Sequence, residues 1–353
     1  MDSALSLDTQ IQKLQEKIKT ANLPPELLEK INGMIGLLSA SLKQGGGTFV
    51  TYESISSYID WVLSLPFNKE TTDLLDLNTA KQVLDKNHYG LESVKNIILE
   101  YMASIILSIK SNPEDKVIRA PILCLIGLVG TGKTTLASSI AQALGRKFER
   151  IPFGGMGDAR ALRGQSRAFA DAEPGLIIKK IVEAGSKNPV ILLDELDRVT
   201  ESARSDIMGV LVELLDPEQN RAFTDHYIDY PFDLSHVLFI ATANNTTNIS
   251  TAVLDRLEIV QMPSYTDAEK ETIAKSYLFP KIRQSTGLSD NQITIDDTLW
   301  PAIIRPLGFD SGIRSLERTI QGICRKSARL IVEGKSPNGV RITNENIKQF
   351  IPT

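Results

Sequence analysis

The chain has 353 residues, of which 42% are hydrophobic and 23% are charged, and its formal net charge is -4. This length allows two or three compact domains, and the hydrophobic content excludes a disordered or fibrous chain. The charge balance gives no electrostatic reason to expect nucleic-acid binding, and no stretch approaches the ~18 apolar residues of a bilayer span. Asp2 and Asp8 make the N-terminus unlike a secretory signal peptide. We therefore expect a soluble, non-secreted protein without a membrane partner.

The N-terminal region has a helical pattern. Apolar residues recur at helical spacing from Leu7 to Leu42, with a break at Pro24 and Pro25, which predicts a helical hairpin. The run Gly45–Gly47 predicts a flexible joint, because glycine has no side chain to restrict its backbone. A further helix is predicted from Tyr52 to Leu65.

From residue 120 onward, short apolar runs alternate with helical patterns, which favours a parallel α/β sheet covered by helices on both faces. The five predicted strands are Ile122–Ile126, Phe148–Pro152, Val190–Asp194, Val237–Ala241 and Glu258–Met262. After Thr266 the pattern is helical again and predicts an all-α domain. The expected domains are a helical segment at 1–65, an α/β domain at 66–265 and a helical domain at 266–353.

A phosphate-loop pattern lies between the first predicted strand and a predicted helix. Glycines let the backbone wrap around phosphates with its N–H groups pointing inward, and the helix N-terminus favours negative charge. Lys133 is expected to reach the β- and γ-phosphates of ATP or ADP, and Thr134 to offer its hydroxyl to Mg²⁺. A chance glycine turn is the alternative, which the strand–loop–helix order disfavours. The residues expected to bind nucleotide here are Gly127, Gly130, Thr131, Gly132, Lys133, Thr134 and Thr135.

Polar residues also follow two other predicted strands. Asp194 and Glu195 end the third strand, at the sheet edge where the phosphate loop is expected. Asp194 is suited to hold Mg²⁺, and Glu195 to orient the water that attacks the γ-phosphate. Asn244 follows the fourth strand as a candidate sensor of the γ-phosphate, although it could instead cap a turn. The pattern therefore predicts an ATPase.

Several longer stretches resemble the Lon protease family of AAA+ P-loop ATPases. The resemblance covers nearly everything after about Ile55 and includes intact phosphate-loop glycines, with Leu128–Val129 where the family commonly has two prolines. The similar blocks are His88–Leu91, Leu211–Asn220, Phe223–Tyr227, Leu254–Arg256, Gly312–Arg318 and Cys324–Lys326.

This resemblance implies further roles. His88 and Tyr89 would lie beside the adenine, and Arg314 on a helical lid would contact the nucleotide as a second sensor. Arg256 would act on the nucleotide of a neighbouring subunit in a ring, usually a hexamer in this family. Exposed ion pairs are the alternative role for both arginines.

The segment from Arg163 to Gly175 resembles the family loop that projects into the central channel of the ring. Phe169, followed by Ala170, would contact unfolded protein substrates through its aromatic ring. The alternative is that Phe169 packs beneath its own loop. Asp171 and Glu173 stand where the family has small or apolar residues, which puts the strength of substrate contact in question.

The resemblance implies an ATP-dependent module that unfolds and threads polypeptides, from a bacterial cytoplasm or alternatively a mitochondrial matrix. The family's proteolytic serine and lysine belong to a domain that would follow Thr353, so we expect a fragment or a split protein. Two other functions stay open at this point. One is a stand-alone AAA+ remodelling or chaperone ATPase, and the other is a nucleotide-regulated scaffold without useful turnover.

Overall fold

A computed structural model describes residues 7–43, 49–111, 121–305 and 312–351. The chain divides into two compact units, each built from segments that are distant in sequence. The first unit comprises Met1–Leu77, Tyr101–Cys124 and Ile140–Glu258, and the second comprises Asn78–Glu100, Leu125–Ser139 and Ile259–Thr353. The predicted glycine joint at Gly45–Gly47 lies outside the described residues, and the domain limits placed after residues 65 and 265 stay predictions.

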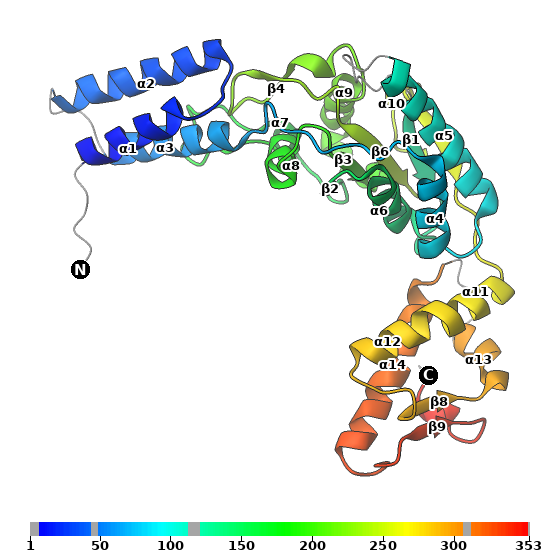
Figure 1. Cartoon of the computed structure of the whole chain (residues 1–353). Coiled ribbons are helices and arrows are strands. Elements are labelled where there is room, and N and C mark those ends of the chain that lie inside the picture. The colour runs from blue at the N-terminus through cyan, green and yellow to red at the C-terminus, as the bar shows by residue number, and fades with distance from the viewer. Residues whose placement is uncertain (1–6, 44–48, 112–120, 306–311, 352–353) are drawn as a thin grey trace. The chain divides into compact units, whose positions relative to one another are not determined.

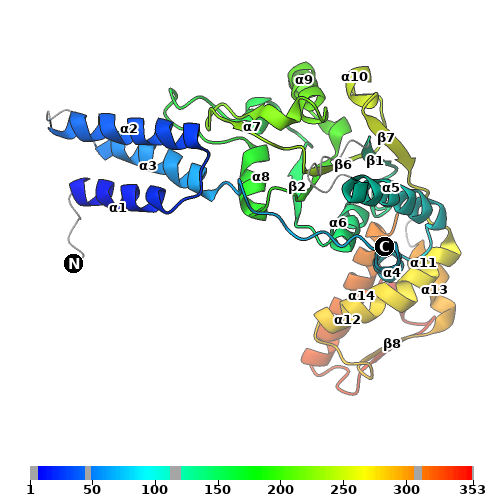
Figure 2. The ribbon, with the colours of Figure 1, turned by 45° about the horizontal axis from the view of Figure 1, so that its top comes forward.

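Three N-terminal helices lie side by side in the first unit (Figures 1 and 2). They are α1 (Leu7–Lys19), α2 (Pro25–Lys43) and α3 (Phe49–Ser64). Ile11, Leu14 and Ile18 form a buried row along α1, as the helical spacing predicted. Pro25 opens α2, where its missing N–H costs no helical hydrogen bond. The helical hairpin and the third helix are confirmed.

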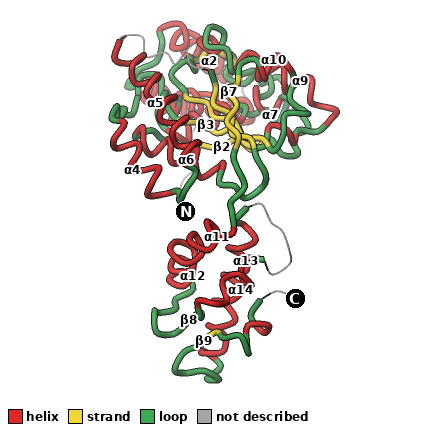
Figure 3. Tube along the Cα trace, turned by 90° about the vertical axis from the view of Figure 1, so that its right-hand side faces the viewer, coloured by secondary structure: helices red, strands yellow, loops and turns green. Residues whose placement is uncertain are grey.

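The five predicted strands form one sheet in the order β2-β3-β6-β1-β7. The neighbours β2, β3 and β6 run parallel, with Val190 of β3 opposite Leu238 of β6. Every residue of β1, β3 and β6 is buried, as strands covered on both faces require. Figure 3 shows the yellow strands between red helices, and the predicted five-stranded parallel sheet is confirmed. The strands are β1 (Ile122–Ile126), β2 (Phe148–Pro152), β3 (Val190–Asp194), β6 (Leu238–Ala243) and β7 (Leu257–Gln261).

Helices and one short hairpin accompany the sheet. The hairpin pairs β4 (Phe223–Thr224) with β5 (Pro231–Phe232) in antiparallel fashion, and its two-residue strands were too short to predict. The helix α8 packs beside β2. The helices of this part of the chain are α4 (Leu77–Asn87), α5 (Glu92–Ser111), α6 (Lys133–Leu144), α7 (Arg160–Arg163), α8 (Leu176–Ala184), α9 (Arg204–Leu214) and α10 (Thr251–Leu254).

The C-terminal part of the second unit is helical, as predicted. Its first helix begins at a capping box, in which Thr266 and Glu269 satisfy each other's backbone N–H groups. Trp300, Leu316 and Ile320 lie in its buried core. A parallel pair of three-residue strands was not predicted, because three residues are too few for alternation to identify a strand and the two strands pair across a long stretch of chain. The elements are α11 (Asp267–Ile273), α12 (Phe279–Ser285), β8 (Ile293–Ile295), α13 (Trp300–Ile304), α14 (Arg314–Val332) and β9 (Val340–Ile342).

A buried ion pair holds the segment between α3 and α4 against the rest of the first unit. Arg146 donates from Nε and Nη2 to the two carboxylate oxygens of Asp73, each at 2.8 Å, and from Nη1 to the carbonyl oxygen of His236 at 3.0 Å. The side chains of Arg146 and Asp73 are only 2% and 9% exposed. Removal of one partner would leave the other charge buried without compensation.

We therefore expect Asp73→Ala to lower the free energy of unfolding of the first unit by about 3–5 kcal/mol. Urea unfolding followed by Trp61 fluorescence in a Trp300→Phe background measures this, because these are the chain's two tryptophans. Lys17→Ala is the control, since it removes an exposed ion pair with Asp60 and should cost no more than about 1 kcal/mol. Equal losses in both variants would contradict the expectation.

Candidate functional site

The glycines of the phosphate loop, residues 127–134, have conformations or contacts that disfavour a side chain. Gly130 and Gly132 have φ angles of 85° and 92°, in the left-handed region that side chains disfavour. A side chain at Gly127 would place its Cβ 2.7 Å from the Cβ and the carbonyl oxygen of Met262. The loop backbone can therefore curl closely between β1 and α6.

Lys133 lies inside the curl of this loop. Its Nζ donates to the carbonyl oxygens of Gly127 at 2.5 Å and Leu128 at 3.0 Å. The hydroxyl of Thr131 donates to Leu128 at 2.9 Å, and that of Thr135 donates to Gly132 at 2.8 Å. Because an ammonium group binds anionic oxygens more strongly than neutral carbonyls, this arrangement fits a phosphate.

A cavity of about 570 Å³ in the second unit opens beside the phosphate loop. Tyr89 is 38% exposed, and its ring centroid lies 6.2 Å from that of Tyr277. Aromatic and apolar walls with a few hydroxyl groups suit a nucleoside. The cavity is lined by Lys86, Asn87, His88, Tyr89, Gly132, Thr135, Ser138, Ser139, Tyr265, Ile273, Tyr277, Leu278, Lys281, Ile313 and Glu317.

His88 is a buried member of this lining. Its Nε2 lies 2.9 Å from the hydroxyl of Ser139, which also accepts a hydrogen bond from Asn87 Nδ2 at 3.0 Å. Burial, reinforced by the positive charge of Lys95, lowers the pKa of His88 to about 4. The imidazole is therefore neutral near pH 7 and can act by packing and hydrogen bonding, not by charge.

We expect the His88 imidazole to stay neutral throughout the range in which an ordinary histidine gains its proton. Its ring C–H resonance, assigned by its loss in His88→Asn, should show no titration midpoint above pH 5 in an NMR pH series. A midpoint near the ordinary value of 6.5 would show that the ring is not buried as described.

Two carboxylates follow β3 in the first unit. Asp194 is only 4% exposed, and its Oδ2 accepts a hydrogen bond from Arg150 Nε at 2.6 Å. Its Oδ1 accepts from the hydroxyl of Thr242 on β6. The same hydroxyl oxygen accepts the backbone N–H of Glu195 at 3.0 Å. Thr242 thus joins the two acidic residues, a role that the sequence analysis missed although Thr242 carries the one hydroxyl in an otherwise apolar strand.

Glu195 has a left-handed backbone, with φ of 62°. Such a conformation costs about 1–3 kcal/mol in a residue other than glycine and persists where the surroundings impose it, often at functional sites. The Glu195 carboxylate lies 3.3 Å from Arg198 Nη1, and a Cβ on Gly154 would come within 2.8 Å of its Oε2. The carboxylate therefore has Arg198 and Gly154 as neighbours while its side chain stays 34% exposed.

Asn244 and the two candidate arginines have different surroundings. Asn244 follows the end of β6 and is partly buried. Arg256 donates to the carboxylate of Asp216 at 3.1 Å and to the carbonyl oxygen of Ala252 at 2.8 Å. Arg314 is exposed at the start of α14, and a Cβ on Gly130 would lie 3.3 Å from its Cβ. The second unit thus brings together the phosphate loop, His88, Tyr89 and Arg314.

The first unit contains the proposed substrate loop and the other four site candidates, Asp194, Glu195, Asn244 and Arg256. Phe169 is 65% exposed in that loop, which does not fit packing beneath it. Glu173 forms an ion pair with Lys179 of α8 at 2.6 Å, so part of its charge is compensated within the loop's own surroundings.

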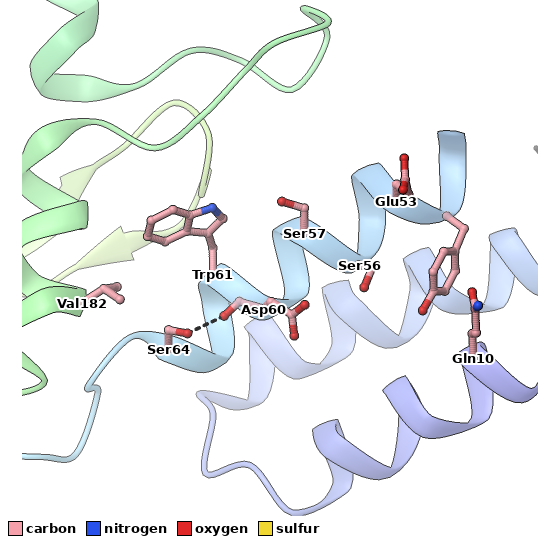
Figure 4. Close-up of a pocket in the computed structure, with 9 residues that line it drawn as sticks. Gln10, Glu53, Ser56, Ser57, Asp60, Trp61, Ser64 and Val182 are labelled. Atoms are coloured by element: carbon pink, nitrogen blue, oxygen red, sulfur yellow. Dashed lines mark hydrogen bonds between the residues drawn. The ribbon is translucent and has the colours of Figure 1, made fainter. Parts of the chain in front are cut away.

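A second cavity, of about 780 Å³, lies among α1, α3 and α8 of the first unit. Figure 4 shows Trp61 of α3 on the same side as Val182 of α8, with Gln10 of α1 at the far end. Its described lining contains serine hydroxyls and the carboxylates of Glu53 and Asp60 but no basic side chain. The negative charge of this lining would repel phosphate, whereas the cavity beside the phosphate loop has lysine side chains in its lining.

The sequence comparisons agree with this geometry. Residues 123–265 match the family model for the ATPase family associated with various cellular activities (AAA), and residues 284–340 match that for the Lon protease AAA+ ATPase lid domain. The chain is 42% identical over 351 residues to the Lon protease of Lawsonia intracellularis, which covers 99% of this chain and 41% of that protein. The chain belongs to the Lon protease family. Within that family it carries the AAA+ ATPase module.

Two further relatives support the assignment. The Lon protease of Desulforamulus reducens is 46% identical over 297 residues, covering 84% of this chain and 36% of that protein. Lon protease 1 of Bacillus subtilis is 42% identical over 346 residues, covering 97% of this chain and 43% of that protein. The chain thus spans less than half the length of these curated Lon relatives. Among the described helices, none combines the length and apolarity that a bilayer span requires.

We expect Thr242→Val to destabilise the first unit, because it leaves a buried oxygen of Asp194 and the N–H of Glu195 without their shared partner. The loss should be about 1–3 kcal/mol, measured by urea unfolding with Trp61 fluorescence in the Trp300→Phe background. Thr242→Ser keeps the hydroxyl and is the matched control. Unfolding midpoints that agree between Thr242→Val and Thr242→Ser would rule out this role for the hydroxyl.

Proposed function

We propose that the chain binds ATP with Mg²⁺ and hydrolyses it to drive the unfolding and threading of polypeptides. In this proposal the loop amides, Lys133 and Thr135 hold the phosphates of ATP or ADP. Thr134 and Asp194 hold Mg²⁺, which prefers hard oxygen ligands and neutralises phosphate charge when bound. The hydroxyl and carboxylate oxygens of these two residues fit that preference.

The single observation that carries the proposal is the pair of acidic residues joined by Thr242. Hydrolysis of a phosphoanhydride needs a positioned water more than it needs covalent chemistry. Glu195 has a partly exposed carboxylate that water can reach, and its strained backbone is held by the Thr242 hydroxyl, as suits a group that orients and polarises this water. Asp194 stays beside it because Thr242 and Arg150 compensate its buried charge.

The remaining candidates have supporting roles in this proposal. His88 and Tyr89 contact the adenine, a role supported by their place in the cavity beside Gly132. Arg314 senses the nucleotide from the start of α14, whose neighbour Ile313 donates a backbone hydrogen bond to the Gly130 carbonyl oxygen at 3.1 Å. Asn244 senses the γ-phosphate from the end of β6.

We further propose a ring of identical chains, a hexamer in the full-length protein, with Arg256 reaching the nucleotide of a neighbour. Arg256 would then exchange Asp216 for the transferring phosphoryl group, whose charge an arginine can stabilise. Phe169 and Ala170 would contact the unfolded substrate. Because the relatives named above are bacterial Lon proteases, we propose that the chain drives ATP-dependent proteolysis in a bacterial cytoplasm.

The test is the variant Glu195→Gln in the full chain. Because the amide cannot accept a proton from the attacking water, steady-state phosphate release should fall by about 10²-fold or more. Calorimetry should show magnesium-dependent ATP binding unchanged within a few-fold, since the phosphate loop is intact.

Glu201→Gln, which changes an exposed glutamate in the segment after β3, is the matched control and should keep the turnover of the unaltered chain. Undiminished turnover in Glu195→Gln would reject the role of Glu195. If the folded, unaltered chain binds neither ATP nor ADP in the presence of magnesium, the entire proposal fails.

A further inference from the structure

The loop that carries Phe169 is closed at its base by two glycines. We call residues 164–175 the Phe169 loop. Gly164 has φ of 74°, and a Cβ there would lie 2.8 Å from the backbone nitrogen of Gly175. A Cβ on Gly175 would lie 2.0 Å from the carbonyl oxygen of Leu162. The two ends of the loop therefore touch through their backbones, and Phe169 is presented from a narrow base.

Asp225 holds this base. Its side chain is fully buried, and its Oδ2 accepts the backbone N–H of Gly175 at 2.7 Å. Its Oδ1 accepts the N–H groups of Tyr227 at 2.8 Å and Ile228 at 3.0 Å. One carboxylate thus fixes both the end of the Phe169 loop and the turn that follows β4.

That same turn is bonded to the N-terminal helices. The hydroxyl of the buried Tyr58 of α3 donates to the carbonyl oxygen of Ile228 at 3.1 Å. Lys30 of α2 donates to the carbonyl oxygen of Asp229 at 2.6 Å and to its carboxylate at 2.7 Å. Asp229 has a left-handed φ of 49°, so the turn keeps a costly conformation while it makes these bonds.

A second connection runs directly from the Phe169 loop to the same helices. The guanidinium carbon of Arg167 lies 3.9 Å from the centroid of the Tyr58 ring, well within the range of a cation–π contact. Arg167 Nη1 also lies 3.6 Å from the sulfur of Met34 on α2. Arg167 is two residues from Phe169, so restraint of its side chain restrains the exposed aromatic ring as well.

We propose that Arg167 and Tyr58 are positioning residues that tie the Phe169 loop to α2 and α3, so that the N-terminal helices set how Phe169 is presented. The assignment of Phe169 to substrate contact rests on the proposed function above. The connection itself rests on the contacts within the first unit. A force or partner acting on α2 and α3 would then reach the substrate-contacting ring through Tyr58 and Arg167.

The test places a reporter at the end of the loop in the full chain. Phe169→Trp in a Trp61→Phe, Trp300→Phe background gives a single indole, because the chain has two tryptophans. Time-resolved anisotropy then measures its local motion. Arg167→Ala and Tyr58→Leu, which remove the cation and the aromatic face, should each increase the amplitude of fast motion. Tyr58→Phe keeps the aromatic face but loses the hydrogen bond to Ile228, and Arg167→Lys keeps the positive charge, so each should increase the motion less than the corresponding truncation.

Lys17→Ala is the matched control, because it breaks an ion pair between α1 and α3 that does not touch the loop. Increased motion of the indole in Lys17→Ala would show that loosening of the helices alone is enough to free the ring. That result would overturn the proposal. Unchanged motion in Arg167→Ala would also overturn it. Tyr58 is buried, so Arg167→Ala decides the test if Tyr58→Leu fails to fold.

A second readout separates positioning from simple stability. In the chain with its native Phe169, Arg167→Ala should raise the concentration of a chemically unfolded polypeptide needed for half-maximal ATPase stimulation by roughly two- to fivefold. The maximal rate should change less than this concentration, and Arg167→Lys should restore much of the loss. A two- to fivefold fall in the maximal ATPase rate, with no change in the polypeptide concentration for half-maximal stimulation, would contradict a positioning role for Arg167. Absence of any turnover in the unaltered chain would instead reject the proposed function, and the anisotropy would still decide the connection.

Discussion

The close approach of the phosphate-loop backbone to the start of α14 is the constraint on which the nucleotide site depends. The carbonyl oxygen of Gly130 accepts the N–H of Ile313, and a side chain at Gly312 would lie 2.5 Å from the carbonyl oxygen of Val129. Glycine is needed at both Gly130 and Gly312, because the two backbones are in direct contact and leave no room for a side chain between them. A change in the backbone of the phosphate loop would therefore act directly on the segment that places Arg314.

Compensation of buried charge is the corresponding constraint in the first unit. A carboxylate taken out of water is costly unless hydrogen bonds and an opposite charge replace its hydration. Asp194 receives both, from the Thr242 hydroxyl and from the half-exposed guanidinium of Arg150. Because Thr242 also receives the N–H of Glu195, the strained backbone of Glu195 is fixed by the same hydroxyl that supports Asp194. The Thr242 hydroxyl thus both supports the buried carboxylate of Asp194 and fixes the backbone of Glu195.

The features predicted from sequence are those that depend on neighbours along the chain. The five strands, the phosphate loop and the paired acids appear as continuous runs or fixed spacings, and the strand limits differed from the structure by two residues at most. Thr242, Arg150 and the contact of Arg167 with Tyr58 could not be predicted in the same way. Their partners are far away in sequence, and although Thr242 carries the one hydroxyl in an apolar strand, that pattern does not say which groups it joins. Tertiary contacts alone give these residues their roles.

The two carboxylates of the Phe169 loop differ in their surroundings. Glu173 is paired with Lys179 on the first turn of α8, although its side chain remains 68% exposed and the pair is weak for that reason. Asp171 is exposed near the tip, close to Phe169 in sequence. Placement of the Phe169 ring therefore depends less on these two carboxylates than on the hydrogen bonds of Asp225 at the base of the loop and on the contact of Arg167 with Tyr58. Because both attachments lead to α2 and α3, the placement of Phe169 depends on contacts at the base of the loop and at Arg167, and loop residues that make no such contact can vary without moving the base.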